Sequence, residues 1–409
     1  MNGKLSSNQQ AIHRAIMLVL LVALIAMQSG RMRADSGLCG SAEFILPFTD
    51  VSNNAFFCSI AAAYFSGLTN GTSATTFSPS ANVPREQMAA FVSRTLDQSL
   101  KRGGDRAALD QWWTQPAIPS TAMTQVDLFP SLVKSDGSDV WVANSTSGSV
   151  SRVRASDGRL LETWLATGAT AVLVARGRVF VAAETNPGRL YSIDPTQPAG
   201  AATLLTDELG GDTQSLAYDG SRIWTANRNA GSISIFRFIC VGSCVTTITA
   251  GFGNPVGILY DGANIWVTDQ GDNMLKKLNS DGSIAQSVPV GFSPRYPIFD
   301  GTNIWVPNQN SASVTVVRVK DSAGNPLAQA FVLATLTGND LNTPRVAAFD
   351  GQRILVTNFN GDSASVWKAT DLTPLGSFTT GVNSRPLGAC SDGINFWIAL
   401  SGTNRLGRF

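Results

Sequence analysis

The sequence contains almost no histidine. His13 is the single histidine among 409 residues, and it lies in an N-terminal segment that we expect to be removed on export. A mature chain without histidine has no imidazole for general acid–base catalysis, a Ser-His-Asp triad or metal binding. No glycine-rich phosphate loop precedes a predicted helix. These absences favour a binding protein over an enzyme, and they predict no catalytic residues and no cofactor.

Charged residues are also scarce, at 14% of the chain, and neither sign dominates, with 30 Lys and Arg against 29 Asp and Glu. Partners such as nucleic acid or an anionic lipid surface select for a basic excess. We therefore expect no nucleic-acid partner. The 38 glycines, by contrast, are typical of a turn-rich β protein.

Residues 1–34 have the layout of an export signal, with a cationic start, the apolar run Ile16–Met27 and small residues up to Ala34. The run is shorter than the ~20 residues that span a bilayer. We expect cleavage near Ala34, and hence an exported envelope or extracellular protein with no membrane span after signal removal. The alternative is an uncleaved anchor, which Arg31 and Arg33 after the run would suit.

The chain has five cysteines, and export would place them in an oxidising compartment. Cys39 and Cys58 flank the start of the first domain and are candidates for one disulfide. Cys240 and Cys244 lie at the two ends of a five-residue stretch and would close a hairpin. Cys390 would then remain as a buried apolar residue. Metal binding is the rival interpretation, but the Cys-x-x-x-Cys spacing has no second pair, so we predict no metal site.

Residues 43–100 read as a small α-helical module. Ile60, Ala63 and Tyr64 recur at helical spacing, and Gly67 is a typical helix end. A second helix is expected from Pro84, with a buried stripe made by Met88, Phe91, Val92 and Leu96.

This module resembles the S-layer homology (SLH) family. The landmarks are Phe48-Thr49-Asp50-Val51, Gly67-Leu68-Thr69-Asn70-Gly71, Phe77-Ser78-Pro79 and Val83-Pro84-Arg85-Glu86-Gln87. The resemblance implies attachment to a cell-wall or surface polysaccharide, with Arg85 near the glycan. It also makes Phe57 the aromatic of the first helix, where the family usually has Trp, and with Arg85 a candidate for contact with the cell-wall polymer. Only one module is present, whereas such modules usually occur three in a row. The alternative for Arg85 is an ordinary exposed residue in the first turn of the second helix.

After a polar linker at 101–111, residues 112–409 repeat one unit, in which an Asp-Gly turn precedes an aromatic-Val-x-Asn segment. The anchor residue of each unit recurs every 39 to 50 residues. Such a period, with four strand-like runs per unit, predicts an all-β, seven-bladed β-propeller. The anchors are Trp141, Phe180, Trp224, Trp266, Trp305, Leu355 and Trp397.

One unit shows the four expected strands most clearly: Pro255–Tyr260, Asn264–Thr268, Met274–Leu278 and Ile284–Pro289. We interpret the recurrent tryptophan as core between blades. The last unit is one strand short, so we expect its outer strand to come from 112–127. This arrangement closes the ring and removes the free sheet edges.

The repeats resemble YVTN-type propeller repeats, as in Trp266-Val267-Thr268-Asp269 and Leu355-Val356-Thr357-Asn358. The resemblance implies an architecture, not a function, because propellers serve binding proteins and enzymes alike. The lack of histidine counts against a streptogramin lyase. We expect a binding or scaffold protein; the alternative is a lactonase-like hydrolase or a quinone-linked oxidoreductase.

A lactonase-like enzyme would need oxygen ligands for a metal at one mouth of the channel. The residues near the end of each second strand could supply them, but their recurrence in every blade favours turn capping instead. These residues are Glu184, Asn227, Asp269, Asn308 and Asn358.

Arginines supply the candidate ligand site. In a propeller, the loops before the inner strands and after the second strands share one face. Arg295, Arg345 and Arg385 adjoin the recurrent proline of three neighbouring units, so their guanidinium groups would converge there on a carboxylate or acidic sugar. Arg228 and Tyr296 would line the same rim. The predicted partner of this face is a protein or a small acidic ligand; the alternative is that these are ordinary solvated arginines.

Overall fold

The computed structural model describes residues 34–39, 42–65, 69–85, 87–89 and 123–409. The chain forms two compact units, Met1–Arg106 and Ala107–Phe409. The expected linker and the expected signal up to residue 33 lie outside the described residues. Within the described ranges, no helix is long and apolar enough to cross a membrane.

The first unit combines a β-hairpin with a helix. Strands β1 (Asp35–Cys39) and β2 (Ala42–Leu46) pair in antiparallel fashion, and helix α2 spans Phe57–Phe65. The helix agrees with the prediction, whereas the hairpin was not predicted, so a purely α-helical module is not what the described residues form. Residues 85 and 87–89 are helical after Pro84, but Met88 is 52% exposed and does not belong to a buried stripe. The other residues of that stripe lie outside the described residues.

The sequence landmarks of this unit converge on one another. The Asp50 carboxylate accepts hydrogen bonds from the backbone N–H of Phe77 (2.9 Å) and of Ser78 (2.7 Å). The ring of Phe48 packs against Tyr64 and Phe77. Gly71 has φ +82°, and a Cβ there would lie 2.5 Å from the Phe48 ring. The motif residues therefore define this fold because they tie its loops together.

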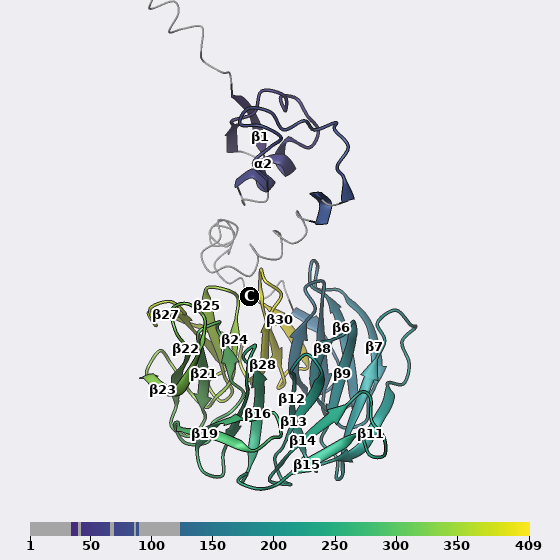
Figure 1. Cartoon of the computed structure of the whole chain (residues 1–409), viewed down its shortest axis with the longest axis vertical. Helices are drawn as coiled ribbons and strands as arrows, with labels where there is room; N and C mark the ends of the chain where they lie inside the picture. Colours follow the sequence, from purple (N-terminus) through teal and green to yellow (C-terminus); the bar gives the residue numbers. More distant parts are fainter. Residues whose placement is uncertain (1–33, 40–41, 66–68, 86, 90–122) are drawn as a thin grey trace, which may run out of the picture. The chain divides into compact units, whose positions relative to one another are not determined.

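The second unit is a seven-bladed propeller, which confirms the predicted fold class. Seven four-stranded antiparallel sheets follow one another along the chain. Figure 1 shows β12, β16, β24 and β28 toward the centre of the propeller and β7, β11, β23 and β27 at its periphery. From the inner strand outward, blade 1 holds β4 (Pro130–Ser135), β5 (Asp139–Asn144), β6 (Ser149–Arg154) and β7 (Leu160–Leu165); blade 2, β8 (Ala169–Ala175), β9 (Arg178–Ala183), β10 (Gly188–Ile193) and β11 (Thr203–Leu209); blade 3, β12 (Thr213–Tyr218), β13 (Arg222–Asn227), β14 (Ser232–Arg237) and β15 (Val245–Ile248); blade 4, β16 (Pro255–Tyr260), β17 (Ile265–Asp269), β18 (Met274–Leu278) and β19 (Ile284–Pro289); blade 5, β20 (Ile298–Phe299), β21 (Asn303–Asn308), β22 (Ser313–Lys320) and β23 (Pro326–Leu336); blade 6, β24 (Pro344–Phe349), β25 (Arg353–Asn358), β26 (Ser363–Lys368) and β27 (Pro374–Thr379); blade 7, β28 (Pro386–Ser391), β29 (Phe396–Leu400), β30 (Arg405–Arg408) and β3 (Met123–Gln125).

The ring closes as predicted. Strand β3, from the beginning of the array, pairs with β30 at its end, with Thr124 opposite Leu406. Blade 7 therefore takes its outer strand from the other end of the array, and both ends are held by one sheet.

The recurrent tryptophans are core residues between blades, as expected. Trp266 of blade 4 is 1% exposed and packs against Ile304 and Val306 on the second strand of blade 5. Its indole N–H also donates a 2.7 Å hydrogen bond to Asp261, the aspartate of the Asp-Gly turn. The same carboxylate accepts the N–H groups of Ala263 and Asn264. One aspartate therefore caps the turn and satisfies the buried indole, which explains why the two residues recur together.

A buried asparagine ends the second strand in four blades. In blade 3, Asn227 donates to Ser232 and to Ser234 (2.9 Å) on the next strand. Blade 4 has Asp269 and Lys276 at the corresponding positions, joined by a 2.7 Å ion pair with side chains 0% and 2% exposed. The other three asparagines are Asn144, Asn308 and Asn358.

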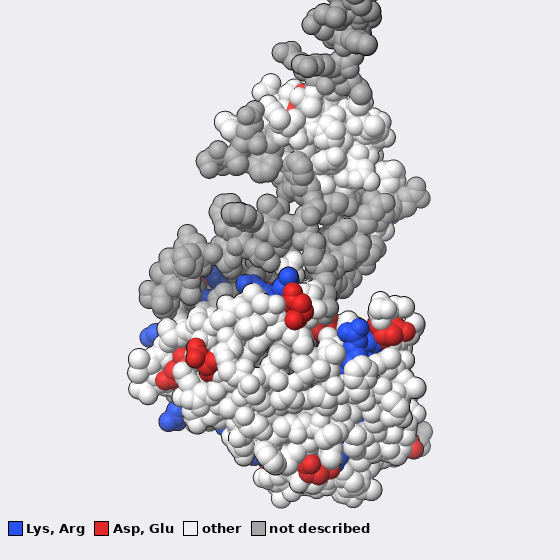
Figure 2. Space-filling view, turned by 90° about the vertical axis from the view of Figure 1, so that its left-hand side faces the viewer, with Lys and Arg blue, Asp and Glu red and all other residues white. Residues whose placement is uncertain are grey.

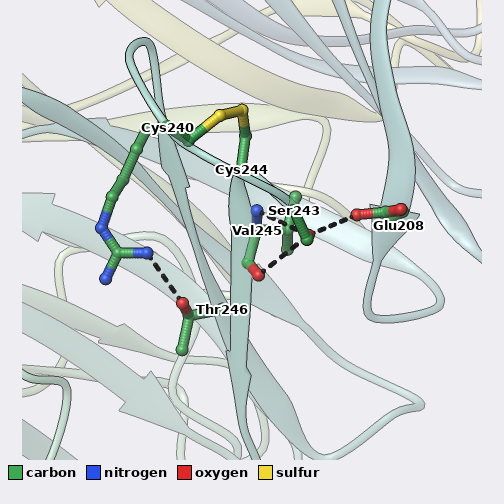
Figure 3. Close-up of a disulfide and its surroundings, with 7 residues drawn as sticks. Glu208, Cys240, Ser243, Cys244, Val245 and Thr246 are labelled. Atoms are coloured by element: carbon green, nitrogen blue, oxygen red, sulfur yellow. Dashed lines mark hydrogen bonds between the residues drawn. A yellow bond between two sulfur atoms is a disulfide. The ribbon is translucent and has the colours of Figure 1, made fainter.

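The predicted disulfide between Cys240 and Cys244 is confirmed, and it closes the turn between β14 and β15. Figure 3 shows this turn beside Glu208, which accepts a 2.6 Å hydrogen bond from Ser243. Cys58 is disulfide-bonded, and its sulfur lies 3.5 Å from the Leu38 carbonyl oxygen. The side chain of Cys39, its predicted partner, lies outside the described residues. Cys390 is a buried free thiol, and burial raises its pKa to about 12.

Candidate ligand site at the tunnel mouth

Seven polar side chains gather where the inner strands begin and the second strands end. We call this set the tunnel mouth. Every one of its charged residues engages another member through a hydrogen bond or through its charge. Its members are Glu184, Asp212, Gln214, Arg228, Arg295, Tyr296 and Arg345.

The mouth spans the central tunnel. The Tyr296 hydroxyl of blade 5 lies 2.9 Å from Oε1 of Gln214 in blade 3, to which it donates a hydrogen bond. Blade 4 separates these two blades along the ring, so the bond crosses the tunnel. The Gln214 amide in turn donates to the buried carboxylate of Asp212. A hydrogen-bonded chain thus connects blade 5 with blade 3, which are not neighbours in the ring.

Local sequence places Arg295 and Tyr296. Pro297 has no N–H for a sheet ladder, which fits the short inner strand β20 of blade 5. The carbonyl of Arg295 instead accepts a 2.7 Å hydrogen bond from Thr268 of blade 4. This approach requires Gly257, because a Cβ there would lie 2.4 Å from Pro297.

Backbone bonds then fix Tyr296 beside Arg345. The Tyr296 N–H donates to the Arg345 carbonyl at 3.1 Å, and the Ala347 N–H donates back to Tyr296 at 3.2 Å. The structure therefore brings together four of the five arginine-site residues that the sequence predicted: Arg228, Arg295, Tyr296 and Arg345.

On one side of the mouth, Arg228 is neutralised by acids. Its Nε lies 2.8 Å from Asp212 and its Nη2 lies 3.5 Å from Glu184. Glu184 is the more exposed of the two carboxylates, at 47% against 6%. Burial, followed by the charge of Asp212, raises the pKa of Glu184.

On the other side, Arg295 and Arg345 form what we call the arginine pair. Within the described part of the chain, neither forms an ion pair with a carboxylate: Arg295 donates to the Gln309 amide oxygen at 2.5 Å, and Arg345 lies 4.7 Å above the Phe359 ring. The Nε of Arg345 is buried without a hydrogen-bond partner among the described residues. Burial, followed by the charge of Arg345, lowers the pKa of Arg295 to about 10, and burial lowers the pKa of Arg345 as well. This wall therefore carries positive charge that the protein does not compensate.

Arg385 does not join this pair. It has φ +46° and an exposed side chain, and its contacts within the described ranges are made by its backbone. Its N–H donates to Asp362 at 2.9 Å and its carbonyl accepts from Ser401 at 2.6 Å.

A pocket of about 270 Å³ adjoins the acidic side of the mouth. Its walls combine the acids Glu184 and Asp212 with asparagines and small residues. We call it the acidic pocket. It is lined by Glu184, Thr185, Asn186, Gly211, Asp212, Asn229 and Ala230.

The residues considered as metal ligands have other roles here. Asn227, Asn308 and Asn358 are buried and bonded to Ser or Thr, and Asp269 is paired with Lys276. Asp269 also caps the N–H groups of Gly253, Asn254 and Gly271, in line with the expected turn capping. Glu184 belongs to the mouth. Among the described residues, no group of three His, Cys, Asp or Glu is placed to hold a metal ion.

Sequence reasoning missed Asp212, Gln214, Gln309 and Phe359. A signal for two of them was present, because Gln309 and Phe359 directly follow the second strand of their blades, as Glu184 and Arg228 do. No sequence pattern distinguishes Asp212 and Gln214, whose roles depend on the partners that they meet.

Of the two predicted glycan-contacting residues, Arg85 is exposed and Phe57 is not. Phe57 is 7% exposed and belongs to the core of the first unit, with Leu46 and Ile60. The ring of Phe57 therefore contributes to the core of this unit.

The propeller face in Figure 2 carries few charged side chains, with Lys and Arg near Asp and Glu rather than in one basic field.

Comparisons with known proteins agree with the two units. Residues 47–89 match the sequence model of the S-layer homology domain family. No curated protein sequence matches the chain. The fold and the match define a propeller protein that carries an SLH domain, and SLH domains are cell-surface attachment modules.

The propeller resembles many solved structures at low sequence identity. A streptogramin B lyase structure has a TM-score of 0.55 and 14% identity, covering 70% of this chain and 96% of that chain. A catalytically inactive histidine-to-alanine variant of virginiamycin B lyase from Staphylococcus aureus, with quinupristin, has the same TM-score and identity. That match covers 70% of this chain and 98% of the lyase chain. Hydrazine synthase from Kuenenia stuttgartiensis has a TM-score of 0.54 and 14% identity, covering 70% of this chain and 97% of that chain. At such identities the likeness concerns the fold alone.

Proposed function

We propose that this protein is an exported, envelope-attached binding protein whose propeller holds a carboxylate ligand at the tunnel mouth. The observation that carries the proposal is the arginine pair. Two neighbouring guanidinium groups lie partly buried with no carboxylate partner in the described chain, and the charge of Arg345 disfavours that of Arg295. A bound carboxylate would supply the missing counter-charge and a partner for the buried Nε of Arg345.

We propose binding rather than catalysis for the propeller. In the catalytically inactive virginiamycin B lyase variant, one histidine is replaced by alanine. This chain has no histidine after residue 13. The groups assembled at the mouth are cations, acids, an amide and a phenol. This set suits recognition of charge more than proton transfer at neutral pH.

The first test measures binding of oligogalacturonate and poly-glutamate to the purified protein by calorimetry. Arg295→Ala and Arg345→Ala should each weaken binding about tenfold or more, since a charge-assisted hydrogen bond contributes about 1.5–3 kcal/mol. Arg405→Ala, in an exposed arginine of β30, is the matched control and should bind as the wild type does. Equal affinity of all three variants, or no binding of either probe by the wild type, would refute the proposal.

Attachment is proposed for the first unit, through its exposed Arg85. Cells that express the full chain should retain it in the wall fraction, whereas a chain without residues 43–100 should be released. Arg85→Ala should weaken retention without unfolding the propeller. Equal retention of the shortened chain would exclude attachment through this unit.

A further inference from the structure

The acidic pocket carries more negative than positive charge, because its two carboxylates share one guanidinium group. Asp212 is well satisfied, since it accepts from Arg228 at 2.8 Å and from Gln214. Among the described residues, the one ion pair of Glu184 is with the Nη2 of Arg228, at 3.5 Å, and its side chain is half exposed and lines the pocket. A hydrogen bond with Gln214 favours its ionised form. Burial and the neighbouring Asp212 both disfavour its ionised form. A cation in the pocket would relieve this repulsion, because the single guanidinium of Arg228 serves two carboxylates.

The acidic pocket and the arginine pair belong to one site. The hydrogen-bonded chain Tyr296–Gln214–Asp212 runs from the blade of Arg295 to the wall of the pocket. The Tyr296 phenol also responds to charges on both sides: burial raises its pKa, the three arginines lower it, and Glu184 raises it. Glu184 and the arginine pair therefore both act on the Tyr296 phenol, which places them around one shared site.

We propose that the ligand of the tunnel mouth is zwitterionic: a free peptide whose amino group lies against Glu184 and whose carboxylate lies against Arg295 and Arg345. This inference rests on the proposed carboxylate site and names the class of molecule that fills it. The pocket volume of about 270 Å³ is below the 300–1,000 Å³ typical of whole ligand sites, so it suits one amino-terminal residue. Its small lining residues, Gly211 and Ala230 among them, leave room for that residue.

The test uses unbranched glycine peptides, because they differ only in length and end groups. Diglycine, triglycine and tetraglycine are each titrated into the full-length protein as the free, N-acetylated and C-amidated forms. At the length that spans the mouth, the free peptide should bind at least about tenfold more tightly than either blocked form, since each blocked end loses one charge-assisted contact.

Two variants assign the ends. Glu184→Gln should remove the advantage of the free peptide over the acetylated one and leave its advantage over the amide. Arg345→Met should do the reverse. Asp207→Asn, in an exposed acid of β11, is the matched control and should change neither ratio.

The outcomes distinguish this inference from the proposed carboxylate-binding function on which it rests. If, at every length, acetylated peptides bind as tightly as free ones, the ligand is a simple anion: the zwitterion is overturned and the carboxylate site stands. If neither the peptides nor oligogalacturonate nor poly-glutamate binds, both ideas are refuted. Unchanged end-group ratios in Glu184→Gln would likewise overturn the assignment of the amino group.

Discussion

The buried ion pair of blade 4 can be tested by substitution, because four other blades have an asparagine and a serine or threonine at the same two positions. Asp269 and Lys276 occupy the positions of Asn227 and Ser234 in blade 3. The variants are Asp269→Asn, Lys276→Ser and the two together. The double variant gives blade 4 the same two residues that blade 3 has at these positions.

The expected magnitudes follow from burial. Lys276→Ser leaves the Asp269 carboxylate fully buried, with three backbone N–H donors but no counter-charge. Asp269→Asn leaves the buried ammonium with Gly251 and the half-exposed Asp272. Removing one partner of a buried pair costs about 3–5 kcal/mol, whereas replacing both with a compatible neutral pair costs far less. We expect Lys276→Ser to lose about 3–5 kcal/mol and Asp269→Asn somewhat less, because Asp272 remains as a partner of Lys276. The double variant should lose no more than about 2 kcal/mol, the cost of the lost lysine stem.

The assay is urea unfolding of the full chain, followed by tryptophan fluorescence, because the tryptophans report blade packing. A double-mutant cycle should give a coupling free energy of at least about 3 kcal/mol in favour of the double variant. Strict additivity, with the double variant as unstable as the sum of the singles, would refute the reasoning.

Acid titration checks the same pair. Burial raises the pKa of Asp269, but hydrogen bonds from Lys276 and three backbone N–H groups outweigh it, so the net pKa lies below the ordinary 3.8. A lowered carboxylate pKa stabilises the fold above pH 3.8, and this stability is lost as the pH falls through the lowered pKa. The double variant has no carboxylate at this position, so its stability should not fall in this way between pH 3.8 and the lowered pKa of Asp269.

Three further predictions concern the blades and the mouth. Trp266→Phe should cost about 1–3 kcal/mol in urea unfolding, because the Asp261 carboxylate loses its buried donor; a change below 0.5 kcal/mol would contradict that role. Thr124→Pro should cost about 3 kcal/mol by removing an N–H from the closing strand, and an unchanged unfolding midpoint would mean that β3 does not hold the ring shut. Because the pKa of Arg295 is lowered to about 10, carboxylate affinity should fall as pH rises through about 10, and calorimetry showing constant affinity up to pH 11 would exclude Arg295 as a charged contact.

The blades themselves could be predicted from the sequence. Each Asp-Gly turn, strand run and tryptophan is specified within about ten residues, and the unit recurs seven times. Strands β16, β18 and β19 match the predicted bounds, and β3 comes from the segment that was expected to close the ring. Short-range turn chemistry and a fixed period determine such a fold, since each blade buries its faces against copies of itself.

The site depended on the tertiary structure. From the sequence, Arg295, Arg345 and Arg385 all adjoin the recurrent proline, with Arg385 offset by two positions. Only the first two meet, because the backbone of Arg385 is held by Asp362 and Ser401. Tyr296 and Gln214 are 82 residues apart in the chain, and only the arrangement of blades 3, 4 and 5 around the tunnel brings them together. Repetition specifies each blade locally, whereas charge balance at the mouth is a sum over several blades that no single repeat contains.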